Sequence, residues 1–114
     1  MVRSGKFWRD REKRIMGGLG LRTQPGSGSL DWTRKEDGES DTILAQLKST
    51  EAKSITVNKQ DLLDLFYHAR VSHKLPVFVI DFVGQESFQM LLVRRDELKE
   101  IAEALHEDQG SSEL

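Results

Sequence analysis

The chain has 114 residues, of which 37% are hydrophobic and 32% charged, and it carries a net charge of −2 without any cysteine. This length allows one domain with a real core and leaves little room for a second. The lack of cysteine excludes disulfides and cysteine-ligated zinc. The most apolar run, 76–83, contains Asp81 and is too short to span a bilayer, and residues 1–6 lack the apolar core of a signal peptide. We therefore expect a cytoplasmic protein that does not enter a membrane.

Charge is distributed unevenly along the chain. Residues 1–36 contain nine Lys or Arg against four Asp or Glu, whereas the remainder contains eight bases and fifteen acids. Positive potential gathered at one end of a molecule suits a surface that binds a polyanion such as DNA. A basic helix that is simply solvated would give the same count, so charge leaves both interpretations open.

A first helix is predicted over residues 6–16. Trp8, Ile15 and Met16 fall on one apolar stripe at helical spacing, and Glu12 lies within that stripe. A carboxylate on an apolar face is costly unless a cation lies beside it, so Glu12 needs either an arginine or a metal ion as its partner. The pair Gly17-Gly18 is expected to end the helix, since glycine tolerates the geometry of a helix C-terminus.

Three strands are predicted next, over 21–24, 32–37 and 43–50, with a turn at 38–41. The hairpin formed by the last two would bring Asp37 close to Gln46. Gln46 and Lys48 share one face of their strand because side chains alternate. Between the first two strands lies Pro25-Gly26-Ser27-Gly28-Ser29, whose backbone and hydroxyl groups could bind a phosphate, although a plain turn has the same composition.

The second half of the chain continues the alternation of helix and strand. Asn58 is expected to cap a helix, strands follow at 77–83 and 88–93, a helix covers 95–106, and residues 107–114 form a frayed tail beyond a single domain, 1–106. This order predicts an α/β protein with a central mixed sheet of about five strands flanked by helices. Inward positions of the two helices are predicted to be Leu62, Leu65, Phe66, Ala69, Leu98, Ile101, Ala102 and Leu105. Asp81, inside an apolar strand, is expected to be a partnered structural residue or an interface residue. His68, His73 and His106 are expected to be surface or partly packed residues.

Four features follow one another along the chain: Glu12 of the first helix, the loop 25–28, the run Lys35-Glu36-Asp37 and the strand Gln46-Leu47-Lys48-Ser49-Thr50. Their order resembles that of the PD-(D/E)XK nuclease superfamily. The likeness is greatest to the small Holliday junction resolvases of archaea and phages. It covers about residues 9–105. Two positions depart from the family pattern. Glu36 replaces a proline, which leaves Asp37 and Asp41 as alternatives for the first acid, and Gln46 replaces the second acid.

The resemblance implies a restriction-endonuclease-like fold (α-β-β-β-α-β-β-α) and a homodimeric endonuclease that hydrolyses branched double-stranded DNA with Mg²⁺, for which Mn²⁺ would substitute. Catalysis would depend on Glu12, Asp37, Gln46 and Lys48. The metal ligands would be Asp37, Gln46, the backbone carbonyl of Leu47, and Glu12 directly or through water. Lys48 would orient the attacking water. Residues expected to contact DNA are Arg9, Arg11, Lys13, Arg14, Ser27, Ser29, Lys35 and Thr50.

Two other functions remain open at this point. A non-catalytic DNA-binding protein could keep the nuclease fold, with Gln46 marking the lost acid. A nicking or restriction-type nuclease would share the chemistry and differ in its substrate, although 114 residues leave little room for base-reading elements.

Overall fold

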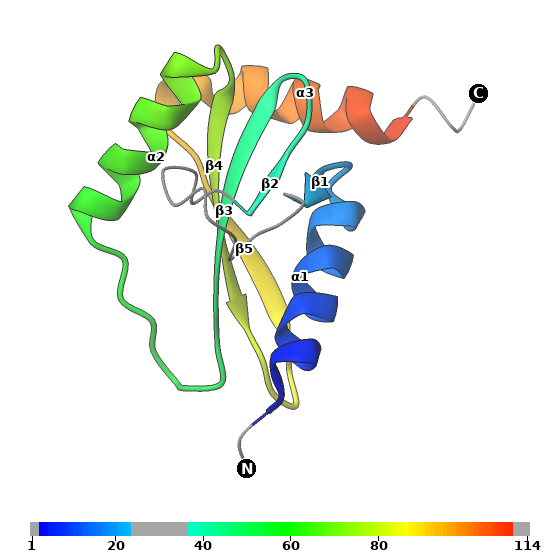
Figure 1. The fold of residues 1–114 in the computed structure, drawn as a ribbon. Coiled ribbons are helices and arrows are strands. Elements are labelled where there is room, and N and C mark those ends of the chain that lie inside the picture. The colour runs from blue at the N-terminus through cyan, green and yellow to red at the C-terminus, as the bar shows by residue number, and fades with distance from the viewer. Residues whose placement is uncertain (1–2, 24–36, 111–114) are drawn as a thin grey trace.

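The computed structural model describes residues 3–23 and 37–110. These residues form three helices and five strands, in the order expected from the sequence (Figure 1). The elements are α1 (Gly5–Gly18), β1 (Arg22–Thr23), β2 (Gly38–Glu39), β3 (Ile43–Thr50), α2 (Lys59–Val71), β4 (Leu75–Phe82), β5 (Phe88–Leu92), the short 3₁₀ turn η1 (Arg95–Glu97) and α3 (Leu98–Gly110). The predicted α/β class is confirmed.

The five strands form one open, mixed sheet with the order β1-β2-β3-β4-β5. β3 and β4 are parallel, and the other neighbours are antiparallel. Alternate residues of β3 point to opposite faces, so Ile43 and Ala45 pack with α1 and α3, whereas Leu44 packs with α2. The sheet therefore has a core on each face, with α2 on one side and α1 and α3 on the other (Figure 1).

Helix α1 has clear local signals at both ends. Ser4 caps its start, where the side-chain oxygen accepts a hydrogen bond from the Phe7 N–H at 3.2 Å. The helix ends at Gly18, as predicted, but the left-handed conformation belongs to Gly20, with φ of 79°, and not to Gly17 or Gly18. Gly38 of β2 lets the helix approach the sheet closely, since an added Cβ would lie 2.6 Å from the Met16 sulfur.

The C-terminal helix differs from the prediction in register and in length. Leu98 is 57% exposed and Ala102 is exposed, whereas Ile101 and Ala104 are buried. The predicted inward positions are right for Ile101 and for Leu105, which packs against the core. They are wrong for Leu98 and Ala102, because α3 packs on the sheet through the side that carries Ala104. Residues up to Gly110 are helical, so the predicted tail begins too early.

The expected hairpin is described only in part. The predicted strand 32–37 lies outside the described residues except for Asp37, and β2 occupies two residues of the predicted turn 38–41. No helix of the described chain is long and apolar enough to span a membrane.

Candidate active site

Asp37 lies against the edge of β3, just before β2 begins. Its Oδ2 accepts hydrogen bonds from the Leu47 N–H at 2.7 Å and from Gln46 Nε2 at 3.4 Å, and its own N–H donates to the Ala45 carbonyl at 2.9 Å. The predicted proximity of Asp37 and Gln46 is therefore confirmed. Asp41, the alternative acid, is exposed in the bend that precedes β3. The structure thus brings Asp37 to the Gln46-Leu47 segment.

Glu12 reaches the same place from α1. Burial of its carboxyl group, the nearby charge of Asp37 and a side-chain hydrogen bond with Asp37 together raise the pKa of Glu12 to about 7. Two carboxyl groups at hydrogen-bond distance favour the state in which one of them keeps a proton, because two adjacent negative charges repel. Glu12 and Asp37 therefore lie side by side, and the partner of Glu12 is an acid rather than the arginine that the sequence offered as one alternative.

This raised pKa predicts a pH-dependent effect on stability. Between the ordinary value of 4.5 and about 7, the folded protein holds a proton on Glu12 that the unfolded chain has lost, so the free energy of unfolding falls as pH rises through this window. Glu12→Gln lacks this penalty. We expect it to be more stable than the parent at pH 8 by about 1–2 kcal/mol, an amount discounted for partial solvent exposure, and nearly equal at pH 4.5. Urea unfolding at both pH values measures the difference, and an equal difference at both would contradict the assignment.

Gln46 and Lys48 share one face of β3, as the alternation of strand residues predicted, and this is the face that α2 covers. Both line a cavity of about 240 Å³ between β3 and α2, which Asp61, Asp64 and His68 also line. The Lys48 ammonium donates a hydrogen bond to the Thr56 carbonyl in the connection that leads to α2. Lys48 is therefore held by the backbone that follows its own strand, on the face of the sheet opposite to α1.

The donor set at this edge fits a hard divalent cation. Glu12 and Asp37 supply carboxylates, and the Gln46 amide, whose nitrogen faces Asp37 here, would supply an oxygen once the amide turns over. In a β-strand, the N–H and C=O of the same residue point to the same side. Because the Leu47 N–H donates to Asp37, the Leu47 carbonyl also faces the side of β3 on which Asp37 lies. Within residues 3–23 and 37–110, no group of three or more His, Asp or Glu side chains could hold a metal ion. Mg²⁺ needs only one or two carboxylates, because it retains waters and shares substrate phosphates.

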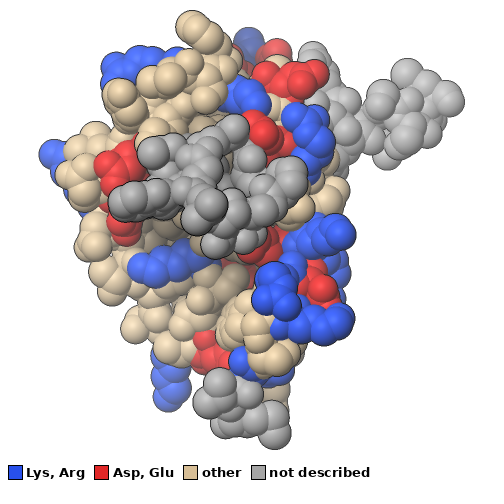
Figure 2. Space-filling view, in the orientation of Figure 1, with Lys and Arg blue, Asp and Glu red and all other residues tan. Residues whose placement is uncertain are grey.

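The basic side chains of α1 lie near this edge of the molecule. Lys6, Arg9, Lys13 and Arg14 are exposed, and Figure 2 shows a cluster of basic side chains over this helix at the right of the view. The half-buried hydroxyl of Thr50, at the end of β3, accepts from the Ala52 N–H at 3.0 Å. The predicted DNA contacts Ser27, Ser29 and Lys35 lie outside the described residues.

Arg11 was predicted to contact DNA, and this prediction is wrong. The residue is only 8% exposed and forms an ion pair with Asp81, with Nε 2.6 Å from Oδ2 and a second nitrogen 2.8 Å from Oδ1. Residue 11 lies one helical turn before Ile15, on the stripe that faces the sheet, so its guanidinium points inward. An arginine on that stripe needs a buried acid, and the aspartate in the apolar strand β4 is that acid.

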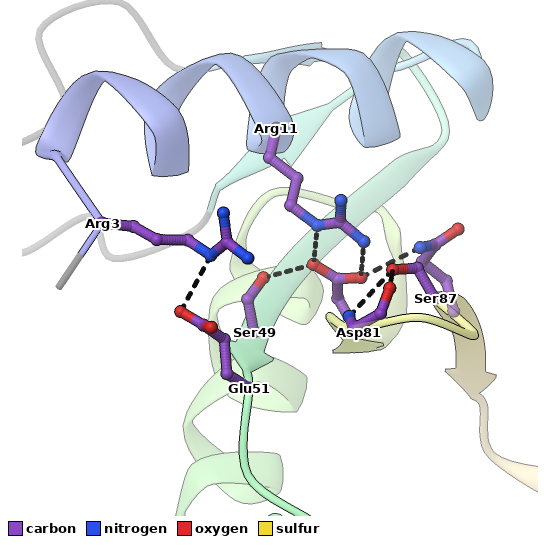
Figure 3. A network of polar contacts seen from close by, with 8 residues as sticks. Arg3, Arg11, Ser49, Glu51, Asp81 and Ser87 are labelled. Carbon is purple, nitrogen blue, oxygen red and sulfur yellow. Dashed lines mark hydrogen bonds and ion pairs between the residues drawn. The ribbon is translucent and has the colours of Figure 1, made fainter. Parts of the chain in front are cut away.

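Asp81 is fully buried within a polar network (Figure 3). Besides Arg11, it accepts hydrogen bonds from Ser49 Oγ at 2.8 Å and Gln89 Nε2 at 2.9 Å. Burial alone would raise the pKa of Asp81, but the hydrogen bonds from Arg11, Gln89 and Ser49 hold it below its usual value. The network joins α1 to β3, β4 and β5. Glu12 directly follows Arg11 in α1, so the network also fixes the direction in which Glu12 points.

The chain was compared with protein-family models, curated proteins and solved structures, and no match was found in any of the three comparisons.

Proposed function

We propose that this protein is a metal-dependent DNA endonuclease of the PD-(D/E)XK type, with a restriction-endonuclease-like sheet and the substrate class of a Holliday junction resolvase. The observation that carries the proposal is the contact of Asp37 with both Glu12 and the Gln46-Leu47 segment of β3. In the superfamily that the sequence resembles, the residues at these positions form the catalytic set. Lys48 lies two residues after Gln46, on the same face of β3.

The chemistry follows from the kinds of groups present. Asp37, Glu12, the Gln46 amide oxygen and the Leu47 carbonyl would hold Mg²⁺, which when bound supplies Lewis acidity and lowers the pKa of its water. Lys48 would orient the attacking water and stabilise negative charge that develops on the phosphate. The exposed bases of α1 would contact the DNA backbone. Cutting two strands across a symmetric junction requires two active sites, which a homodimer provides.

Incubation with a four-way junction and with linear duplex, each with and without Mg²⁺, tests the proposal. We expect Mg²⁺-dependent cleavage of the junction and little cleavage of the duplex. Equal cleavage of both substrates would instead indicate the nicking or restriction-type activity. Binding of both without cleavage would contradict the proposal and indicate the non-catalytic DNA-binding protein.

The substitution Gln46→Glu should tighten metal binding and retain activity, because a charged carboxylate replaces a neutral amide beside the cation. We expect the dissociation constant for Mn²⁺ to fall about tenfold, measured by calorimetric titration. Gln60→Glu, at an exposed position of α2, is the matched control and should leave the dissociation constant unchanged. Unchanged or weaker binding in Gln46→Glu would show that Gln46 is not a ligand.

The double substitution Arg9→Ala/Lys13→Ala should lower the affinity for the junction and make that affinity less dependent on salt concentration. The two residues lie one turn apart on the exposed side of α1. The slope of log affinity against log salt should decrease by about one unit for each DNA phosphate that the variant no longer neutralises. Lys99→Ala, on α3, serves as the control for a general loss of charge. If both variants keep the parent slope, the basic side of α1 does not bind DNA.

A further inference from the structure

Strand β5 forms one edge of the sheet and is exposed along its whole length. All five of its residues are exposed, including Phe88 at 48%, Met90 at 55% and Leu92 at 38%. Its other side is paired with β4, and within the described chain no strand follows it in the sheet order. It contains no charged residue and no proline, whereas the opposite edge strand β1 has only two residues. Soluble proteins usually protect such an edge, because it invites pairing with another strand.

We propose that β5 pairs antiparallel with β5 of a second copy of this chain, around a two-fold axis that passes through Met90. An isologous dimer requires a surface that is complementary to itself. With the axis at Met90, this residue lies opposite the partner's Met90, and Phe88 lies opposite the partner's Leu92. Both kinds of pair are apolar and lie on the same face of the sheet, which is the arrangement that stabilises neighbouring strands.

Charges on either side of β5 support this register. Glu86 lies in the turn before β5, Arg94 follows the strand in an extended conformation, and both are exposed. Within its own chain Arg94 lies 3.7 Å from Asp96 and over the Phe66 ring, and its side chain is still 49% exposed. The register through Met90 brings Glu86 next to the partner's Arg94, and symmetry repeats this pair at the other end. Moving the axis to a neighbouring residue removes both pairs, because it sets Glu86 opposite Leu92 or Phe88 opposite Arg94. The flanking charges therefore select this register, since the neighbouring registers also pair apolar residues of β5.

The dimer would join two sheets into one of ten strands, with the same face of each copy on the same side. The two β3 strands, which carry the candidate active sites, would be five strand spacings apart, about 24 Å. This consequence rests on the proposed function. The pairing itself rests only on β5 and its flanking charges.

Cross-linking tests the register directly, because the chain has no cysteine of its own. Opposite residues of antiparallel strands have Cα atoms about 4.5–5.5 Å apart, within the range of a disulfide. Met90→Cys should therefore form a disulfide-linked dimer on mild oxidation. Phe88→Cys, at a similarly exposed position of the same strand, should not, since its partner is Leu92 rather than itself. No cross-link in Met90→Cys, or equal cross-linking in both variants, would overturn the proposal.

A charge swap tests the same pairing without a covalent bond. Sedimentation should show a dimer for the parent. The single variants Glu86→Arg and Arg94→Glu should each raise the dimer dissociation constant about tenfold or more. The double variant should recover the parent dissociation constant, because opposite charges again face each other. Circular dichroism confirms that each variant is folded. A monomeric parent, or single variants that dimerise as well as the parent, would overturn the proposal. Junction cleavage is scored separately, so a dimer without cleavage contradicts only the proposed function.

Discussion

Asp37→Asn is expected to abolish Mg²⁺-dependent cleavage of branched DNA, with a rate at least about a hundredfold below that of the parent. The reason is chemical rather than steric. Asparagine keeps the shape of aspartate, and its side-chain oxygen can still accept the hydrogen bond from the Leu47 N–H, but the charge that would hold the cation is gone. Removal of the charge also relieves repulsion of Glu12, so the fold should not be weakened. Single-turnover cleavage of a four-way junction measures the rate, and gel shift measures DNA binding, which should stay near the parent value.

Asp41→Asn is the matched control, because Asp41 lies four residues away and is exposed. It should cleave at the parent rate. Full activity in Asp37→Asn together with loss of activity in Asp41→Asn would move the site to the β2–β3 bend. Full activity in both variants would show that cleavage does not depend on the carboxylates at this edge of the sheet.

Asp81→Asn should produce the largest loss of stability, about 3–5 kcal/mol in the free energy of unfolding. The substitution leaves the guanidinium of Arg11, which is only 8% exposed, without its counter-charge. The ends of β3 and β5 would each lose a charge-assisted hydrogen bond as well, since Ser49 and Gln89 both donate to Asp81. Urea denaturation measures the loss. Cleavage should fall with it, because the same network directs Glu12 toward Asp37.

Two further variants distinguish the loss of a buried ion pair from the loss of an exposed charge. Asp96→Asn removes an exposed partner of Arg94, 3.7 Å away, and should cost less than about 1 kcal/mol. The double substitution Arg11→Met/Asp81→Leu should recover much of the stability that Asp81→Asn removes, because no unpaired charge remains. A small loss in Asp81→Asn, similar to that in Asp96→Asn, would show that water reaches Arg11 and that the pair does not anchor α1.

The sequence was most informative where the spacing of residues determines proximity. A hairpin between residues 37 and 46 places Asp37 beside Gln46, and the apolar stripe of the first helix directs Glu12 toward the sheet. Strand alternation likewise predicted that Gln46 and Lys48 share a face. Each of these inferences uses only local geometry, which a periodic pattern contains.

The sequence was less informative where the outcome depends on elements that are distant along the chain. Arg11 looked like one more base of a basic helix, and only the packing of α1 against β4 shows that Asp81, 70 residues later, neutralises it. The raised pKa of Glu12 has the same origin, because it depends on burial and on Asp37 from another element. The residues of β5 have the composition of a buried strand, yet its position at the edge of the sheet leaves them exposed.

We expect Glu12, Asp37 and the Gln46-Leu47 segment of β3 to form a divalent metal site. Calorimetric titration of the parent with Mn²⁺, alongside the double variant Glu12→Gln/Asp37→Asn, tests it most directly. Both substitutions keep side-chain shape, so circular dichroism should show the same folded protein. We expect one saturable Mn²⁺ site per chain in the parent and none in the double variant. Equal Mn²⁺ binding by both proteins, or no binding by the parent, would show that these residues do not form the site.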